Sequence, residues 1–481
     1  MYKLISEHLN ITWNMKYINK SILNSLLFLL ITYAMPLQSS ENLLSVYEKA
    51  FEHDPTIRAA KANYQAILEL KPQAMSYFFP ALTFNTSSSQ SNSEDMNPMP
   101  DYRTGRPITG TTGTGSYREA RSISLNLNQT IFDMTAITGL SLTNKRLAQA
   151  EALYNYEQQN LFLRVSESYF NVLAAQDRLA AQTTAREAIG RQLDLAQSRF
   201  ELGLIPVTDV QESQAGYDLA IASEIESKRL LSSAKEFLRE IIGGYIDDLS
   251  APRVDMPLIN PEPNNIDEWV EMSLKQNLAL ISSKINTEIA EENINLQKGN
   301  RLPGITFSGN LTESSTDVTR SLFCVDEEEC PVRINSNTAP EGYNVSLNIS
   351  FPIFTGGFNS SKIRQSIHEH RAAKESTEGV ARQTERVTRD SFLGVISEIS
   401  RVNALTQAVQ SSSTALLATE AGFEVGTRTA VDVLVSQNSL AQAETNLARS
   451  KYDYILNILQ LRQSVGDLSI KDIHEINSWL N

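Results

Sequence analysis

Histidine, cysteine and excess positive charge are all scarce in this chain of 481 residues, and each shortage excludes a class of protein. The five histidines have no spacing that would hold a metal ion, so we expect no metal site. With 42 Lys and Arg against 56 Asp and Glu, the net charge of −14 argues against a nucleic-acid partner, which requires a basic face. The sequence also lacks a recognisable pairing of a nucleophile with a base, so we expect neither an enzyme nor a bound cofactor.

Long apolar runs are absent except near the N-terminus. Residues 21–34 are mostly apolar, Lys16 and Lys20 precede them, and small residues follow. This is the pattern of a secretory signal peptide, and the run is too short to span a bilayer as a mature helix. We therefore predict that residues 1–40 are a signal peptide and leader, with Met15 as a hypothetical start of translation.

The two cysteines lie close together in the acidic stretch "CVDEEEC", at Cys324 and Cys330. In an exported protein, two nearby cysteines without a neighbouring histidine favour a disulfide over a metal site. Free thiols are the alternative. Neither cysteine stands at a signal cleavage site, so we expect no N-terminal lipid anchor.

The chain contains a long internal repeat. The stretches "GLIPVTDVQES" (203–213) and "GTRTAVDVLVS" (426–436) are 223 residues apart, and the same offset aligns glycines, aspartates and apolar residues far beyond them. Such an offset predicts two copies of one structural unit. We assign residues 41–250 to the first repeat, 251–264 to a linker rich in Pro and Asn, 265–468 to the second repeat and 469–481 to a C-terminal segment.

Each half shows the same order of patterns, namely a helix, a strand, a loop, a strand, a long helix, a turn and a helix. Asp54 followed by Pro55 is a favourable helix start, because a capping side chain precedes a proline at the first helical position. The predicted long helix, residues 134–200, measures roughly 100 Å, so it must pack against neighbouring helices as in a coiled coil. The first half is predicted to contain a helix over residues 54–77 with a kink at Pro72, strands over 81–87 and 122–132, a long helix over 134–200 and a final helix over 207–242.

The strand candidates alternate between apolar and polar residues. Ile123, Leu125 and Leu127 point to one side, and serines and asparagines occupy the positions between them. Two interpretations remain open at this point: a soluble antiparallel sheet packed on the helices, or a membrane barrel with its apolar face toward lipid. In the barrel interpretation, residues 88–121 and 313–342 are external loops. The four predicted strands are residues 81–87, 122–132, 304–312 and 343–354.

A barrel made of these strands requires several chains. Open sheet edges are not tolerated in lipid, and single-chain barrels begin at about eight strands, whereas one chain here offers four. Three copies would supply twelve.

The two repeated stretches, extended to "RFELGLIPVTDVQ" (199–211) and "GFEVGTRTAVDVL" (422–434), resemble the TolC family of outer membrane efflux proteins. The resemblance extends over nearly the whole mature chain. It implies an α+β membrane protein, a homotrimer whose twelve-stranded β-barrel continues into a long α-helical coiled-coil tunnel. The implied location is the outer membrane of a Gram-negative bacterium, with a large periplasmic part.

The resemblance also implies a function. Members of this family are exit ducts that work with an inner membrane transporter and a periplasmic adaptor, in tripartite efflux or in type I secretion. A soluble periplasmic coiled-coil adaptor or scaffold is the alternative from another class, since it would share the signal peptide and the helical hairpins. The sequence leaves the cargo open among drugs, proteins and metals.

The repeated turns are predicted to form a gate at the far end of the tunnel. Thr429 and Asp432 have the spacing of a capping box, and so do Asp209 and Glu212. In a trimeric tube Asp432 would also form a ring of three carboxylates. By resemblance, Arg428 ties its tip to the neighbouring copy, with Thr208 and Asp209 as its partners.

The gate departs from the family pattern at two positions. Phe423 stands where the family has a tyrosine, so one latch hydrogen bond is lost, and Val435 stands where the family has a second aspartate. We therefore expect one acidic ring backed by an apolar ring, and weaker block by divalent cations. The turns themselves, which are also the expected adaptor-docking positions, are Gly203 with Leu204 and Gly426 with Thr427.

Overall fold

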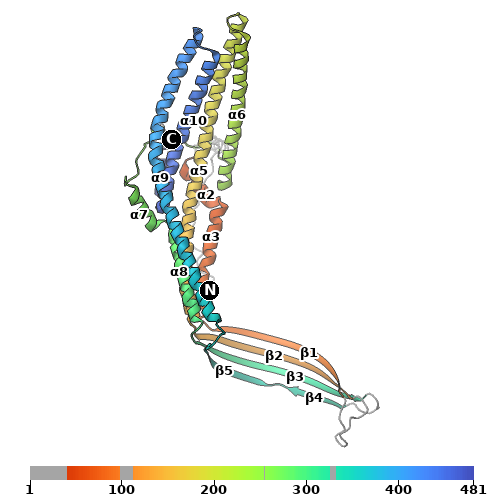
Figure 1. The fold of residues 1–481 in the computed structure, drawn as a ribbon. Coiled ribbons are helices and arrows are strands. Elements are labelled where there is room, and N and C mark those ends of the chain that lie inside the picture. Colours follow the sequence, from red (N-terminus) through yellow and green to blue (C-terminus); the bar gives the residue numbers. More distant parts are fainter. Residues whose placement is uncertain (1–40, 98–111, 247, 254, 325–331, 481) are drawn as a thin grey trace, which may run out of the picture.

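The computed structural model describes residues 41–97, 112–246, 248–253, 255–324 and 332–480. Long helices form a rod, and a sheet of long strands extends from one end of that rod at an angle (Figure 1). The predicted signal peptide and leader, residues 1–40, lie outside the described residues. None of the described helices carries a stretch long and apolar enough to cross a membrane.

The first half of the chain folds largely as its periodicity predicts. The long helix and the final helix agree with their predicted bounds to within a residue. The predicted helix 54–77 is divided at Glu69, because Pro72 has no N–H to bond one turn back and interrupts the regular helix. The elements are α2 (Leu43–His53), α3 (Pro55–Leu68), α4 (Leu70–Ser76), β1 (Ala81–Asn97), β2 (Thr112–Phe132), α5 (Met134–Glu201) and α6 (Val207–Ile242).

The second half repeats this order of elements with small differences. The short helices α2 and α7 were not predicted as separate elements. Each begins after an asparagine that accepts a hydrogen bond from the helix, Asn42 from Ser45 N–H and Asn265 from Asp267 N–H. The elements are α7 (Ile266–Gln276), α8 (Leu278–Gly299), β3 (Gly304–Cys324), β4 (Val332–Thr338), β5 (Glu341–Ser350), α9 (Phe358–Glu424) and α10 (Ala430–Val465), followed by α11 (Ile470–Asn477).

The sheet is antiparallel, and its strands are longer than the sequence predicted. Strand β1 pairs with β2, β2 pairs with β3, and β4 and β5 pair with successive parts of β3. The prediction that residues 88–121 and 313–342 are loops is therefore wrong where the structure has strand, at 88–97, 112–121, 313–324, 332–338 and 341–342. These segments are mostly polar in sequence, so they show no regular alternation that would reveal a strand.

One face of the sheet is apolar and exposed. Its rows are formed by apolar residues placed directly across from one another, such as Leu82 with Leu127 and Leu125 with Leu311. Leu347, opposite Phe307, is 62% exposed, because no other described element covers this face. A soluble sheet would bury these side chains against the helices.

The opposite face of the sheet is polar and carries no charge where the first face is apolar. Asn310 donates to Asn126 across the strand pair, and the Ser308 and Ser346 hydroxyls are 2.7 Å apart. Asn348 adds a hydrogen bond to Ser308 at 3.2 Å. The sheet therefore separates an apolar environment from a watery one.

The main hydrophobic core lies in the middle of the rod rather than at the tips. Tyr169, Phe170 and Tyr454 are its largest buried side chains, from α5 and α10. The hydroxyl of Tyr169 donates to the Ser250 carbonyl at 2.6 Å, and that of Tyr454 donates to the Ile259 carbonyl at 3.0 Å. The core thus fixes the linker region against the long helices.

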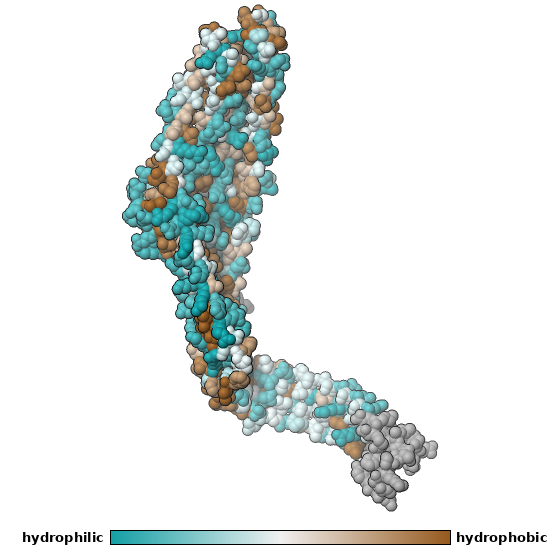
Figure 2. Space-filling view, viewed as in Figure 1, coloured by the Kyte–Doolittle hydropathy of each residue, from teal (hydrophilic) through white to brown (hydrophobic). Residues whose placement is uncertain are grey.

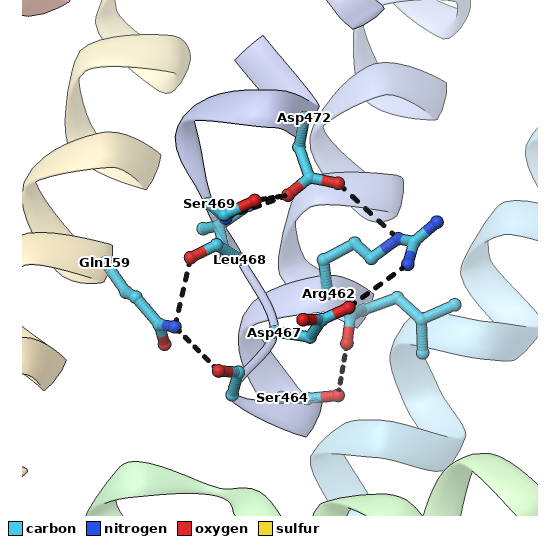
Figure 3. A network of polar contacts seen from close by, with 9 residues as sticks. Gln159, Arg462, Ser464, Asp467, Leu468, Ser469 and Asp472 are labelled. Atoms are coloured by element: carbon cyan, nitrogen blue, oxygen red, sulfur yellow. Dashed lines mark hydrogen bonds and ion pairs between the residues drawn. The ribbon is translucent and has the colours of Figure 1, made fainter.

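A polar network attaches the C-terminal segment to the same region (Figure 3). Gln159 of α5 donates to the carbonyls of Gly466 and Leu468, at 3.0 and 3.1 Å. Arg462 of α10 forms ion pairs with Asp467 at 3.5 Å and Asp472 at 3.7 Å. The segment that follows α10 is therefore part of the middle of the rod.

Replacing Asp54 with alanine is expected to lower the free energy of unfolding by about 2 kcal/mol, because the change removes both a helix cap and a buried ion pair. Asp54, at 2% exposure, accepts from Ile57 N–H at 2.8 Å and receives the Arg164 fork at 3.1 and 3.2 Å. Thermal unfolding followed by circular dichroism measures the loss. Asp390→Ala is the control, since its ion pair with Arg386 is exposed and contributes at most about 0.5 kcal/mol.

The Asp54 contribution should depend on pH in one direction. Burial alone would raise the pKa of Asp54, but the hydrogen bonds from Arg164 and Ile57, with the charge of Arg164, outweigh it and lower the pKa. The stabilisation is therefore present above the ordinary carboxyl pKa of about 4 and is lost as the pH falls below it. Equal stability of the wild type and Asp54→Ala at neutral pH would contradict this account.

Candidate gate at the hairpin tips

Helices α5 and α6 form one hairpin and α9 and α10 a second, and both tips lie at the end of the rod farthest from the sheet (Figure 1). In each turn a glycine follows the first helix with a left-handed backbone. The φ angle is 71° at Gly203 and 78° at Gly426, so each glycine supplies the left-handed residue that ends the helix before it.

The second turn contains the capping box that the sequence predicts. Thr429 N–H donates to the Asp432 carboxylate at 2.9 Å, and Asp432 N–H donates to the Thr429 hydroxyl at 3.2 Å. These hydrogen bonds, with a smaller contribution from the charge of Arg428, lower the pKa of Asp432. The Asp432 side chain, at the start of α10, is therefore an ionised carboxylate at neutral pH.

The capping box predicted for the first turn is wrong. The N-cap of α6 is Pro206, no side chain caps it, and Asp209 is already inside the first turn of the helix. Proline's fixed φ begins the helix before Asp209, whose N–H bonds to the Pro206 carbonyl at 3.2 Å. The Asp209 carboxylate is therefore not engaged as a cap, and among the described residues it accepts only from the Thr208 hydroxyl, at 3.3 Å.

Arg428 is exposed, and its guanidinium forms no hydrogen bond or ion pair with any residue in the described part of this chain. Its backbone N–H bonds to the Gly422 carbonyl at 3.2 Å. A Cβ atom at Gly422 would lie 2.8 Å from Arg428 Cγ, so the glycine lets the arginine stem lie close against α9. One chain does not join Arg428 to Thr208 or Asp209, and the contact between neighbouring copies stays a prediction.

The two positions that depart from the family pattern have different surroundings. Phe423, at 4% exposure, packs with Ala430 and Val433 in a small core inside the second tip. Val435, one turn beyond Asp432 along α10, is 58% exposed. Other apolar side chains gather on the tip surface (Figure 2), including Leu202, Leu204 and Val425.

Sequence analysis gave no role to Arg199, although the structure places it between the two hairpins. Its guanidinium lies over the Phe423 ring, 4.6 Å from the ring centroid. It also donates to the carbonyls of Phe423 and Glu424, at 3.0 and 3.2 Å. A basic residue in the last turn of α5 was the available signal, but nothing in the sequence indicates that it reaches α9.

The remaining site predictions concern metals and the disulfide. Among the residues that the structure describes, no group of three His, Cys, Asp or Glu side chains is placed to hold a metal ion. Cys330, the predicted disulfide partner of Cys324, lies outside the described residues, so the disulfide stays a prediction.

Comparison with known proteins gives consistent matches over most of the chain. The model of the family described as "Outer membrane efflux protein" matches residues 46–244 and again residues 269–467. Outer membrane protein TolC of Vibrio cholerae is 32% identical, over 92% of this chain and 94% of that protein. The alkaline protease secretion protein AprF of Pseudomonas aeruginosa is 26% identical, over 90% of this chain and 85% of that protein.

A solved structure shares the fold. The Campylobacter jejuni CmeC outer membrane channel superposes with a TM-score of 0.68 at 15% identity, covering 100% of this chain and 98% of that one. The similarity extends across both the helical rod and the sheet.

Proposed function

This chain belongs to the outer membrane efflux protein family, and we propose on that premise that three copies of it close into one continuous duct. The protein is an outer membrane exit duct for efflux or type I secretion, with a long periplasmic part. The alternative of a soluble periplasmic scaffold is set aside, because the family is one of outer membrane proteins.

The two-faced sheet with open edges carries the proposal. Its apolar face is exposed over several rows, and its opposite face is lined with amides and hydroxyls. Among the described residues, β1 has a partner on one side only, and so do β4 and β5. Because β4 and β5 pair with successive parts of β3, they occupy one strand position, and each chain fills four positions. Lipid does not tolerate open edges, so β1 of one copy pairs with the β4 and β5 edge of the next, and three copies form a twelve-stranded barrel.

The duct is built from an internal duplication. The two family-model matches and the same order of helices and strands in both halves support this assignment. The repeats are residues 41–250 and 265–468, joined by the linker 251–264. The leader 1–40 precedes them, and the C-terminal segment 469–481 follows them.

The barrel section itself does not select its cargo by charge. Across the apolar band, the residues facing the lumen are asparagines, serines and threonines, with hydrogen bonds from Asn310 to Asn126 and between Ser308 and Ser346. Selection therefore belongs to the inner membrane transporter. A periplasmic adaptor docks at the tips, around Gly203, Leu204, Gly426 and Thr427. One relative is named for the secretion of a protease, so protein cargo is within the range of this family.

The tips form the periplasmic gate. Arg428 of one copy reaches Thr208 and Asp209 of the next, and Asp432 forms the acidic ring. Both sides of the latch are exposed and unpaired with each other in one chain, which suits a contact between copies. Phe423 supports the turn from inside the tip, and Val435 forms an apolar ring one turn from the acidic one.

Two neighbouring substitutions in β5 test the barrel. We expect Leu347→Arg to abolish assembly in the outer membrane, because a lipid-facing arginine costs roughly 2–4 kcal/mol in every chain. Ser346→Arg adds the same charge to the face lined with hydroxyls and amides and should leave assembly intact. The measurement is the amount of heat-sensitive oligomer in the outer membrane fraction. If both variants assembled equally well, the assignment of faces would be wrong.

A further inference from the structure

The two hairpins are joined by polar contacts near the core, and these contacts stop well before the tips. The last of them is the hydrogen bond from Tyr452 of α10 to Asp177 of α5. From Asp177 to Arg199, α5 extends roughly 33 Å. Over that length no side-chain hydrogen bond or ion pair connects the first hairpin to the second among the described residues. Arg199 supplies the next connection, at the tips.

The Arg199 contact is built from three parts. The guanidinium lies 4.6 Å from the centroid of the Phe423 ring, and its two terminal nitrogens donate to successive carbonyls, those of Phe423 and Glu424. The backbone carbonyl of Arg199 also accepts from Leu204 N–H at 2.9 Å, which closes the first turn. Arg199 thus closes the turn of the first hairpin through its backbone and binds the end of α9 through its side chain.

Arginine suits this position for chemical reasons. The carbonyls at the end of α9 have no partners within the helix, and a cation near a helix C-terminus is favoured by the helix dipole. A planar guanidinium can stack on the ring while its fork reaches two carbonyls, whereas a lysine ammonium offers no plane to stack. Phe423 is held by the small tip core, so the ring presents a fixed face to Arg199.

Apart from Arg199, the hairpins meet near the tips through apolar packing, with the Leu434 side chain close against Gly216, and through polar groups that stay unpaired. A small cavity lies there between α5, α6 and α10, and it is lined in part by Gln192 and Gln437. Both glutamines have a buried amide atom, Nε2 of Gln192 and Oε1 of Gln437, that hydrogen-bonds to no described residue. Unpaired buried amides weaken an interface, and Arg199 supplies the polar connection that these two glutamines do not.

We propose that Arg199 is a positioning residue of the gate, a clasp that holds the second tip against the first within each copy. It acts in series with the latch between copies at Arg428, and it compensates for the hydroxyl that Phe423 lacks. Opening requires the second hairpin to swing away from the first, so all three clasps must break. This inference rests on the proposed function, because a clasp has an effect only where the tips close a duct.

Single-channel recording in planar bilayers tests the clasp. Arg199→Met should lower the ratio of closed to open states roughly 100-fold, because three clasps break together and each contributes roughly fivefold. Arg199→Lys keeps the charge without the fork and should lie between Arg199→Met and wild type. Arg191→Met is the matched control, since Arg191 is exposed two turns earlier on α5 and forms no side-chain hydrogen bond or ion pair with any described residue.

A second comparison separates gating from stability. The temperature at which the oligomer dissociates should be the same for wild type, Arg199→Met and Arg191→Met, because the core lies in the middle of the rod. Adding Phe423→Leu to Arg199→Met should cause little further opening, since the ring acts through the arginine. Wild-type gating in Arg199→Met, or equal opening in Arg191→Met, would overturn the clasp while the duct stands. Absence of channels in the wild type would instead overturn the proposed duct.

Discussion

Replacing Arg428 with alanine is expected to convert small, brief openings of the channel into large, long-lived ones. The wild-type arginine is exposed at the tip and unpaired within its own chain, while Asp209 is not engaged as a helix cap. An arginine can bind a carboxylate through two parallel hydrogen bonds, which fixes the orientation of the two tips. Removing it takes away the one contact that we expect between neighbouring copies at the gate.

The size of the effect follows from the symmetry. A partly exposed ion pair contributes about 1 kcal/mol or less, and three act together in the trimer. Their loss should therefore change the ratio of closed to open states by roughly 100-fold at most. The measurement is the single-channel conductance and open time of the purified protein in a planar bilayer. A gate of this modest strength remains breakable when an adaptor binds the tips.

The matched control is Arg382→Ala, in helix α9 of the hairpin whose turn carries Arg428. Arg382 pairs with Glu378 on an exposed surface far from the tip, so its loss should leave the openings unchanged. A charge exchange gives a second check, since Asp209→Arg combined with Arg428→Asp should restore closure that either change alone destroys. Stable pores of equal conductance in wild type and Arg428→Ala would keep the duct and remove the latch.

The helices were predictable because their pattern is local. Apolar residues recur every three or four positions along α5, and a glycine or proline marks each end of the turn that follows, so residues 134–200 and 207–242 could be assigned closely. The outer halves of the strands were not predictable for the opposite reason. Residues 88–97 and 112–121 are mostly polar in sequence, and a strand with two polar faces shows no alternation.

The same distinction applies to the gate, where contacts between residues close in sequence were predictable and contacts between distant residues were not. The cap made by Thr429 and Asp432 involves residues three apart, so spacing alone revealed it. The Arg199 contact joins residues more than 200 positions apart, and only packing of the two hairpins brings them together. The partner of Arg428 is expected on another copy, so neither the sequence nor one chain could contain that contact.

Asp432→Asn is expected to abolish most of the cation selectivity of the pore. The asparagine oxygen can still accept from Thr429 N–H, so the helix cap remains and only the charge is lost. In a salt gradient the reversal potential should move toward zero, because the barrel lumen across the apolar band has no charged residue. Glu424→Gln is the control, since it removes an exposed carboxylate from the same tip without touching the ring.

Block by Mg²⁺ should change in parallel and shows whether Asp432 acts as a ring. Three carboxylates about 8 Å from a divalent ion contribute about 1 kcal/mol after salt screening, so Asp432→Asn should raise the half-blocking concentration roughly fivefold. Val435→Asp should act in the opposite direction, because it adds a second acidic ring at an exposed position one turn away. Tight block by Mg²⁺ in Asp432→Asn, or in Asp432→Ala, would show that the acidic ring lies elsewhere, since such a pore has lost the three carboxylates to which the proposal assigns the block.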